Sequence, residues 1–379
     1  LEKTELICLS ITLRYPKEFI GWHVLSAALG IQGKYAEAVK PNEVAIQLSP
    51  QSAEAHCNLG NTYRALGRLD VAEGHLRTAI SLTPRFAESY NNLGLTLKAQ
   101  KRLSEAEDSF QQALNLNPKF AEAHYNFANV KKEQHKYNDA ESHYQQAISI
   151  KRSYPEALAN LGTTLELLNR SSEAVTYLKK AIALQENFSE AIYNLGISLR
   201  SLNRLNEAAI AFQTVISHDP SSENGHCSLA TVQIQLGLYR EAEKASRTAI
   251  SIREDYGEAH STLGLALHNQ GKFSEAVKSH TRAVNLSPCS AAIHTNLALS
   301  LEALGQVEAA VYHNRQAFPL RTKIETDPTD PLAPATTTIL FEITNECNFH
   351  CTFCPSDSQE RKIGFMKLEL IKKLYSEAA

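Results

Sequence analysis

The sequence predicts an α-helical solenoid over most of its length, followed by the start of an α/β domain. Nine consecutive 34-residue blocks run from Phe19 to Ile324 without an insertion or deletion, and residues 1–18 continue the register as a half block. Such a period is the mark of repeated helix–turn–helix units that stack on one another. Positions below are counted within each block, so that Phe19 holds position 1.

Two positions of every block accept only small side chains, which predicts a close crossing of two helices. Side chains larger than a methyl group there would hold the helix backbones apart. Position 20 is alanine in all nine blocks: Ala38, Ala72, Ala106, Ala140, Ala174, Ala208, Ala242, Ala276 and Ala310. Position 8 holds Ser26, Gly60, Gly94, Ala128, Gly162, Gly196, Ala230, Gly264 and Ala298.

Turn residues divide each block into two helices. The mid-block segments 65–69, 201–205 and 269–273 place Gly or Asn where a left-handed residue would end the first helix. Proline near the block end predicts the end of the second helix. It stands at position 32 in five blocks, as Pro50, Pro84, Pro118, Pro220 and Pro288.

These motifs resemble the tetratricopeptide repeat, whose pattern is matched by YNNLGLTL and AEDSFQQALNLNP within residues 90–118. The resemblance covers residues 1–18 as a partial repeat and 19–324 as nine repeats. It implies a right-handed α-solenoid with a concave groove lined by the first helix of each repeat.

Composition narrows the class of partner. The 379 residues are 43% hydrophobic and 21% charged, with a net charge of −3, which gives no electrostatic case for nucleic acid. No apolar run approaches the ~20 residues that span a bilayer, and residues 1–19 lack the apolar core of a signal peptide. We therefore expect a cytoplasmic protein with no membrane partner. Because the chain begins with Leu1, we also expect a fragment.

A row of asparagines at position 6 is the candidate peptide-binding element. An amide carries donors and an acceptor and can pair with an extended peptide backbone. The array is similar in this to O-linked N-acetylglucosamine transferases, in which such a ladder binds substrate peptide. The alternative is that the amides bond within the scaffold. The row consists of Asn58, Asn92, Asn126, Asn160, Asn194 and Asn296.

Position 12 adds charge to the same helices. Arg64, Lys98, Lys132 and Arg200 are opposed by Glu166 and Glu302. A solvated helix face explains most charges of this kind, while an acidic ligand is the other interpretation.

Histidines and scattered cysteines are expected to be structural. Position 4 is expected to be a packing position for a large flat ring. It holds His56, His124, His226, His260 and His294. Because these histidines lie one repeat or more apart, they cannot share a metal ion. Cys8, Cys57, Cys227 and Cys289 lie in the repeat region and are expected to be small buried hydrophobes, since nothing resembles a disulfide framework.

The repeat register ends at Ile324. Residues 325–335 contain three prolines and predict a semi-rigid linker. Residues 336–344 are rich in β-branched residues and predict a strand. Residues 366–378 predict an amphipathic helix. Strand, loop and helix make one βα unit, and a lone parallel strand has no partner. Residues 336–379 therefore read as a truncated domain.

Three cysteines in the intervening loop, Cys347, Cys351 and Cys354, have C-x3-C-x2-C spacing. Structural zinc would require a fourth ligand that His350 does not easily supply. A disulfide would leave one thiol over and requires an oxidising compartment. A [4Fe–4S] cluster fits better, because three thiolates hold three irons and leave the fourth iron open.

With Phe353 before the last cysteine, Pro355 after it and R-x-x-G-x-M at 361–366, this loop resembles the radical S-adenosylmethionine superfamily, in particular enzymes with a SPASM domain. The resemblance implies the first βα unit of a partial (β/α)6 barrel. It further implies a cluster that reductively cleaves S-adenosylmethionine, with Phe353 near the adenine. The glycine-rich strand that holds the cofactor in this family is not found, so we expect these residues alone to be catalytically incomplete.

The sequence thus predicts a repeat array that captures a peptide or protein, fused to the entrance of a radical S-adenosylmethionine enzyme. The rival hypothesis is a scaffold for protein–protein interaction that is not an enzyme. The sequence does not name the substrate or the partner.

Overall fold

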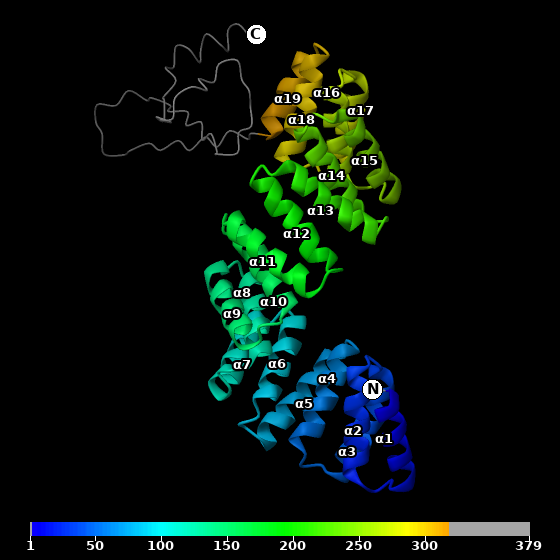
Figure 1. Cartoon of the computed structure of the whole chain (residues 1–379), viewed down its shortest axis with the longest axis vertical. Helices are drawn as coiled ribbons and strands as arrows, with labels where there is room; N and C mark the ends of the chain where they lie inside the picture. The colour runs from blue at the N-terminus through cyan, green and yellow to red at the C-terminus, as the bar shows by residue number, and fades with distance from the viewer. Residues whose placement is uncertain (1, 318–379) are drawn as a thin grey trace, which may run out of the picture. The chain divides into compact units, whose positions relative to one another are not determined.

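The computed structural model describes residues 2–317, with side chains from residue 5 onward. These residues are helical, and no strand occurs among them. The first helices of the nine repeats all begin at position 1 (Figure 1). They are α2 (Phe19–Ile31), α4 (Ala53–Ala65), α6 (Ala87–Ala99), α8 (Ala121–Glu133), α10 (Pro155–Leu167), α12 (Ser189–Ser201), α14 (Glu223–Gln235), α16 (Gly257–Asn269) and α18 (Ala291–Ala303).

The second helices all begin at position 17. They are α3 (Tyr35–Leu48), α5 (Leu69–Leu82), α7 (Leu103–Leu116), α9 (Tyr137–Ile150), α11 (Ser171–Leu184), α13 (Leu205–His218), α15 (Tyr239–Ile252), α17 (Phe273–Leu286) and α19 (Val307–Ala317). Helix α1 (Glu2–Arg14) precedes them as the expected half repeat. The 34-residue register is therefore confirmed through residue 317.

The chain divides between Ala317 and Phe318 into two units, of which the first is the helical array. The predicted end of the ninth repeat at 318–324, the linker at 325–335 and the βα unit at 336–379 lie outside the described residues.

Each helix of the array packs against the helices that precede and follow it in the chain (Figure 1). Most first helices also contact the first helix of the next repeat, as α4 contacts α6 and α16 contacts α18. Each repeat buries its apolar face only against close neighbours, so the stability of the array is a sum over adjacent units.

The small residue at position 8 faces position 24 of the same repeat. A Cβ atom added to Gly60 would lie 2.7 Å from Cγ of Leu76, and one added to Gly94 would lie 2.8 Å from the ring of Phe110. The same arrangement joins Gly162 to Leu178, Gly196 to Phe212 and Gly264 to His280. The glycines predicted at the helix crossing are thus required by the large side chain opposite. Position 20 alanines are fully buried in all nine repeats.

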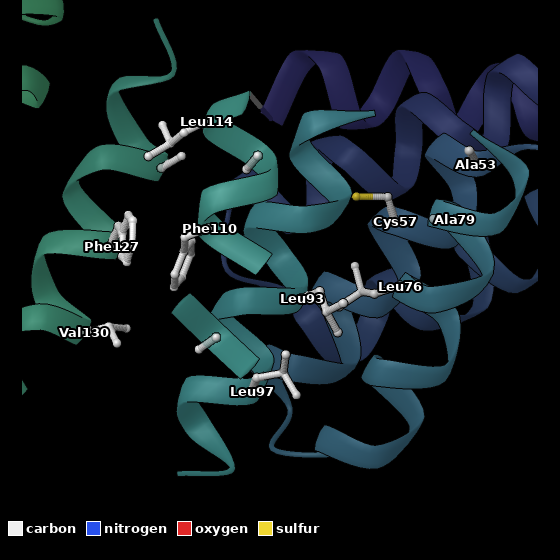
Figure 2. Close-up of a cluster of buried hydrophobic side chains, with 13 residues drawn as sticks. Ala53, Cys57, Leu76, Ala79, Leu93, Leu97, Phe110, Leu114, Phe127 and Val130 are labelled. Carbon is white, nitrogen blue, oxygen red and sulfur yellow. The ribbon is translucent and has the colours of Figure 1, made fainter. Parts of the chain in front are cut away.

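The largest core cluster runs through the second, third and fourth repeats without a break (Figure 2). Leu76, Leu93 and Leu97 lead to Phe110, which is fully buried and stacks on Phe127 with ring centroids 6.2 Å apart. Because this core crosses two repeat junctions, helices of adjacent repeats are held together by burial of apolar surface as well as by hydrogen bonds.

Every mid-repeat turn has a left-handed residue at position 15. Glycine or asparagine occupies seven of these turns: Gly33, Gly67, Asn169, Asn203, Gly237, Gly271 and Gly305. In the other two, Lys101 and His135 adopt φ values of 64° and 61°. A side chain with a Cβ atom costs about 1–2 kcal/mol in this region, so the stack imposes this turn where the local sequence does not favour it.

Charged side chains on the second helices join some repeats to the next. Glu at position 21 meets a cation at position 16 of the following repeat, with N–O distances between 2.6 and 3.3 Å. The pairs are Glu73–Arg102, Glu107–Lys136, Glu141–Arg170 and Glu243–Lys272. The cations of these pairs are 36–49% exposed, although the glutamates are only 14–20% exposed. Pairs with one solvated partner contribute little individually, about 1 kcal/mol or less.

Candidate functional site

The six position 6 asparagines lie on the first helices of their repeats, and all six are half-buried. Five of them donate a side-chain hydrogen bond to an earlier first helix. Nδ2 of Asn126 donates to Oδ1 of Asn91 at 2.9 Å, and Nδ2 of Asn160 to the Tyr125 hydroxyl at 3.1 Å. The others are Asn92 to Cys57 Sγ, Asn194 to Thr163 Oγ1 and Asn296 to Ser261 Oγ.

This bonding pattern follows the repeat. In four of the five cases the acceptor is 35 residues earlier, at position 5 of the preceding repeat. In two of the three repeats where position 6 is not asparagine, the junction is still bonded: Ser228 lies 3.0 Å from the Tyr193 hydroxyl and Thr262 lies 3.7 Å from Cys227 Sγ. In the third, position 6 is Val24, whose side chain has no polar atom. Position 6 therefore joins adjacent repeats, which favours the scaffold interpretation of the amide donors.

The side-chain oxygens of the position 6 asparagines form fewer hydrogen bonds within the protein than their side-chain nitrogens do. Oδ1 of Asn160 accepts from Lys132 Nζ at 3.1 Å. Among the described residues, no protein donor meets Oδ1 of Asn126, Asn194 or Asn296. Asn58 has no side-chain hydrogen bond within this part of the chain, and Nδ1 of His23, at position 5 of the preceding repeat, is buried without a partner. The row thus offers hydrogen-bond acceptors to a ligand and few donors.

The position 12 cations lie one and a half turns further along the same helices. Burial lowers the pKa of Arg64 and of Lys132. Arg64 donates to Asn61 Oδ1 at 2.7 Å, but its Nε is buried without a partner. No carboxylate within residues 5–317 forms an ion pair with Arg64, Lys132 or Arg200, whereas Lys98 is 3.7 Å from Glu133. An anionic group would relieve this unpaired positive charge.

The opposing acids are partly engaged by the scaffold. Glu166 accepts a hydrogen bond from Ser201 at 2.6 Å while its Oε2 is buried without a partner, and Glu302 accepts from Asn314 at 3.2 Å. The face formed by positions 6 and 12 therefore carries cations in the second to fourth and sixth repeats and carboxylates in the fifth and ninth.

Position 4 histidines have the structural role expected of them. Nε2 of His124 donates to the carbonyl of Pro118 at 3.1 Å, and Nε2 of His294 to that of Pro288 at 3.0 Å. His226 and His260 make the same bond to the residue six before them. In these four repeats the ring ties the start of the first helix to the end of the preceding repeat.

Three histidine pairs were not expected from the sequence. Nδ1 of His56, His124 and His294 lies 2.9–3.1 Å from Nδ1 of His75, His143 and His313 respectively. The second member stands at position 23 each time, which is the signal that the sequence offered. Burial, with a smaller contribution from the partner ring, lowers the pKa of His143 to about 4. No group of three or more metal-binding side chains occurs within the described chain.

The scattered cysteines divide into two kinds. Cys8, Cys57 and Cys227 are buried as expected, and burial raises the pKa of each thiol. The expectation is wrong for Cys289, which is exposed. It follows Pro288 in the turn between α17 and α18, where a side chain leaves the helix packing.

Cys347, Cys351, Cys354 and Phe353 lie outside the described residues. The iron–sulfur cluster and the S-adenosylmethionine site therefore stay predictions. Among residues 2–317, no helix combines the length and the apolar character that a membrane crossing requires.

Comparisons with known proteins agree with the repeat register. Sequence profiles described as tetratricopeptide repeat match residues 51–119, 87–153, 119–187, 161–223 and 224–256, and one described as TPR repeat matches 28–67. No curated protein sequence matches the chain.

Solved structures share the fold. A tetratricopeptide repeat protein from Parabacteroides merdae is 20% identical with a TM-score of 0.52, over 66% of this chain and 99% of the other. The Cut9–Hcn1 hetero-tetramer of APC/C is 16% identical with a TM-score of 0.57, over 79% and 59%. PilF of Pseudomonas aeruginosa is 19% identical with a TM-score of 0.51, over 57% and 97%. The profile matches and the helix register together place the chain in the tetratricopeptide repeat family.

Proposed function

We propose that the repeat array is a protein-interaction scaffold that binds an extended segment of a partner along the face formed by positions 6 and 12. The observation that carries the proposal is a row of half-buried polar groups, unbroken from the second to the sixth repeat, that the scaffold leaves incompletely paired. Oδ1 of Asn126 and Asn194 and the cations Lys132 and Arg200 belong to this row.

The bonding of the amides defines which groups of a partner would fit. Because the Nδ2 donors are used between repeats, the remaining Oδ1 atoms accept hydrogen bonds from a donor such as a peptide N–H. Lys132 and Arg200 would attract acidic side chains, whereas Glu166 would repel them. The proposed partner is therefore an extended peptide whose backbone donors face the asparagine row.

A peptide-display selection on the intact chain tests the proposal. We expect the selected peptides to lose binding by about tenfold or more to a variant carrying Asn126→Ala and Asn194→Ala, since two unoccupied acceptors are lost together. Affinity is measured by titration calorimetry. Unchanged affinity of the variant would count against the proposal.

A control separates binding from scaffold stability, because the same amides join repeats. Ser228→Ala with Thr262→Ala removes position 6 hydrogen bonds from two junctions where the residue at position 6 is buried and the asparagine row is interrupted. We expect this variant to lose thermal stability and keep peptide affinity. If it loses affinity as fully as the asparagine variant, then loosening of the stack, and not the amide row, explains the effect.

We propose separately that Cys347, Cys351 and Cys354 bind a [4Fe–4S] cluster, with S-adenosylmethionine as the ligand of the open iron in a complete enzyme. The C-x3-C-x2-C spacing supports this proposal. After anaerobic reconstitution with iron and sulfide, we expect Cys347→Ala to lose iron and the absorbance near ~400 nm that thiolate ligation produces. The exposed Cys289 provides the control, and Cys289→Ala should retain both. Iron content that is equal in the two variants would contradict the ligand assignment.

A further inference from the structure

A pocket of about 420 Å³ is lined by residues of α15, α16 and α17 and by none of the asparagines of the row. Figure 1 shows these three helices as neighbours in the array. Its lining is apolar on one side, where Ile250 and the buried Leu263 contribute. Arg247, Lys278 and Arg282 contribute three cations. An apolar wall beside several cations suits a ligand that has an organic body and an anionic group.

At the pocket, the histidine at position 4 has no second histidine to pair with, as is also true of His226 in the seventh repeat, where position 23 is Ala245. In the second, fourth and ninth repeats, position 23 is a histidine whose ring contacts the histidine at position 4. In the eighth repeat position 4 is still His260, but position 23 is Ser279. Both residues line the pocket. Ser279 therefore stands where the second imidazole ring of each histidine pair stands in those three repeats.

His260 presents a free ring nitrogen on the pocket side. Its Nε2 donates to the carbonyl of Glu254 at 2.9 Å, and since a carbonyl only accepts, the proton is on Nε2. Nδ1 of His260 and the hydroxyl of Ser279 have no hydrogen bond within the described residues. Both are available to a ligand.

Two of the three cations have no acidic partner. Arg247 pairs with Glu243 at 2.8 Å and is 3.9 Å from Glu275. Lys278 and Arg282 form no ion pair within residues 5–317. Their positive charge therefore faces the pocket without compensation from the protein.

The helix packing does not require these charges. Arg247 stands at position 25, and Lys278 and Arg282 stand at positions 22 and 26 of the next repeat. At the corresponding junction in the third and fourth repeats, the same positions are Gln111, Ser142 and Gln146. No other junction of the array combines three cations at these positions. The cluster belongs to this pocket and not to the repeat pattern.

We propose that this pocket binds a phosphate monoester. The dianionic phosphate has three oxygens for Arg247, Lys278 and Arg282, and it accepts a hydrogen bond from the Ser279 hydroxyl. The organic group would lie on Ile250 and Leu263. A carboxylate carries one charge and two oxygens and would engage fewer of these donors. The site shares no residue with the proposed peptide-binding face and stands independently of it.

Calorimetric titration of the intact chain with phenyl phosphate tests the charge requirement. We expect saturable binding that Lys278→Gln with Arg282→Gln weakens by about tenfold or more, because two charge-assisted hydrogen bonds are lost. Lys179→Gln with Lys180→Gln is the matched control, since it removes two charges from positions 25 and 26 of the fifth repeat. No saturable binding by the wild type, or an equal loss in both variants, would overturn the proposal.

Ser279→His tests the shape requirement while it keeps all three cations. The new ring would meet His260 as His143 meets His124, fill the pocket and abolish phenyl phosphate binding. Unchanged binding by this variant would also overturn the proposal.

Phenylacetate should bind at least about tenfold more weakly than phenyl phosphate, and equal affinity would contradict the choice of phosphate. Comparison of phenyl phosphate with a phosphotyrosine peptide then identifies the source: tighter peptide binding indicates a phosphorylated protein, and equal binding indicates a free organic phosphate.

Discussion

Replacing His280 with leucine is expected to raise the free energy of unfolding at pH 7 by about 1–3 kcal/mol. His280 is fully buried against Gly264, and neither of its ring nitrogens has a hydrogen-bond partner. Leucine occupies the same position in the second and fifth repeats, as Leu76 and Leu178, opposite Gly60 and Gly162. The substitution therefore removes two unsatisfied polar atoms and uses a packing that the array already contains.

The same histidine makes the eighth repeat sensitive to acid. Burial, with a smaller effect of His268, lowers the pKa of His280 from 6.5 to about 3. Below pH 6.5 the unfolded chain takes up a proton that the folded chain does not, so stability falls as the pH falls from 6.5 towards 3. The loss from this group is about 1.4 kcal/mol per pH unit, or about 2 kcal/mol between pH 7 and pH 5.

Urea unfolding at pH 7 and pH 5, combined with hydrogen exchange of α16 and α17, measures both effects. The leucine variant should lose about 2 kcal/mol less than the wild type between the two pH values. His218→Gln is the control, because it removes an exposed imidazole and leaves the buried His280 in place. An identical loss in the wild type and the leucine variant would mean that His280 does not take up the proton.

Gly94→Ala is expected to destabilise the array by about 1–3 kcal/mol, although alanine is the better helix former by about 1 kcal/mol. The new Cβ atom would lie 2.8 Å from Cε1 and Cζ of Phe110. That ring is fully buried and packed against Phe127, so it has no room to move away. Thermal and urea unfolding followed by circular dichroism measure the change.

Two further variants test the cause. A Cβ atom added to Gly74 in α5 meets nothing within 4 Å, so Gly74→Ala should stabilise the array by about 0.5–1 kcal/mol. Phe110→Ala alone should cost about 3–5 kcal/mol. In that background Gly94→Ala should become stabilising, and a destabilisation that persists without the ring would rule out the steric explanation.

The sequence predicts the frame of this fold well. Alanine at position 20 and small residues at position 8 indicate the helix crossing in every repeat, and the first and second helices begin at positions 1 and 17 throughout. This success has a physical basis, because a strict period leaves one register in which all units can bury the same apolar face. The left-handed turn at Lys101 and His135 is set by that register against the local preference.

The candidate sites are less accessible to sequence reasoning. Periodicity places the asparagines on one face of the first helices, but the bond from Asn126 to Asn91 depends on how two repeats are offset in space. The contact between His124 and His143 and the pocket at Ser279 likewise depend on how the two helices of one repeat face each other. The repeat period shows which face of a helix a residue lies on, but it does not show which side chain of another helix that residue contacts.

Positions 8 and 24 form a contact within one repeat, whereas positions 5 and 6 form a contact between adjacent repeats. This difference allows the number of repeats to change. Positions 8 and 24 fit each other within one repeat, so inserting or deleting a whole 34-residue unit preserves every such pair. A new junction would bring different residues of positions 5 and 6 together. The asparagine amide already donates to a thiol, an amide, a phenol and a hydroxyl, at Cys57, Asn91, Tyr125 and Ser261. Repeats can therefore be exchanged or added while the asparagine at position 6 still finds a hydrogen-bond acceptor at position 5 of the new neighbour.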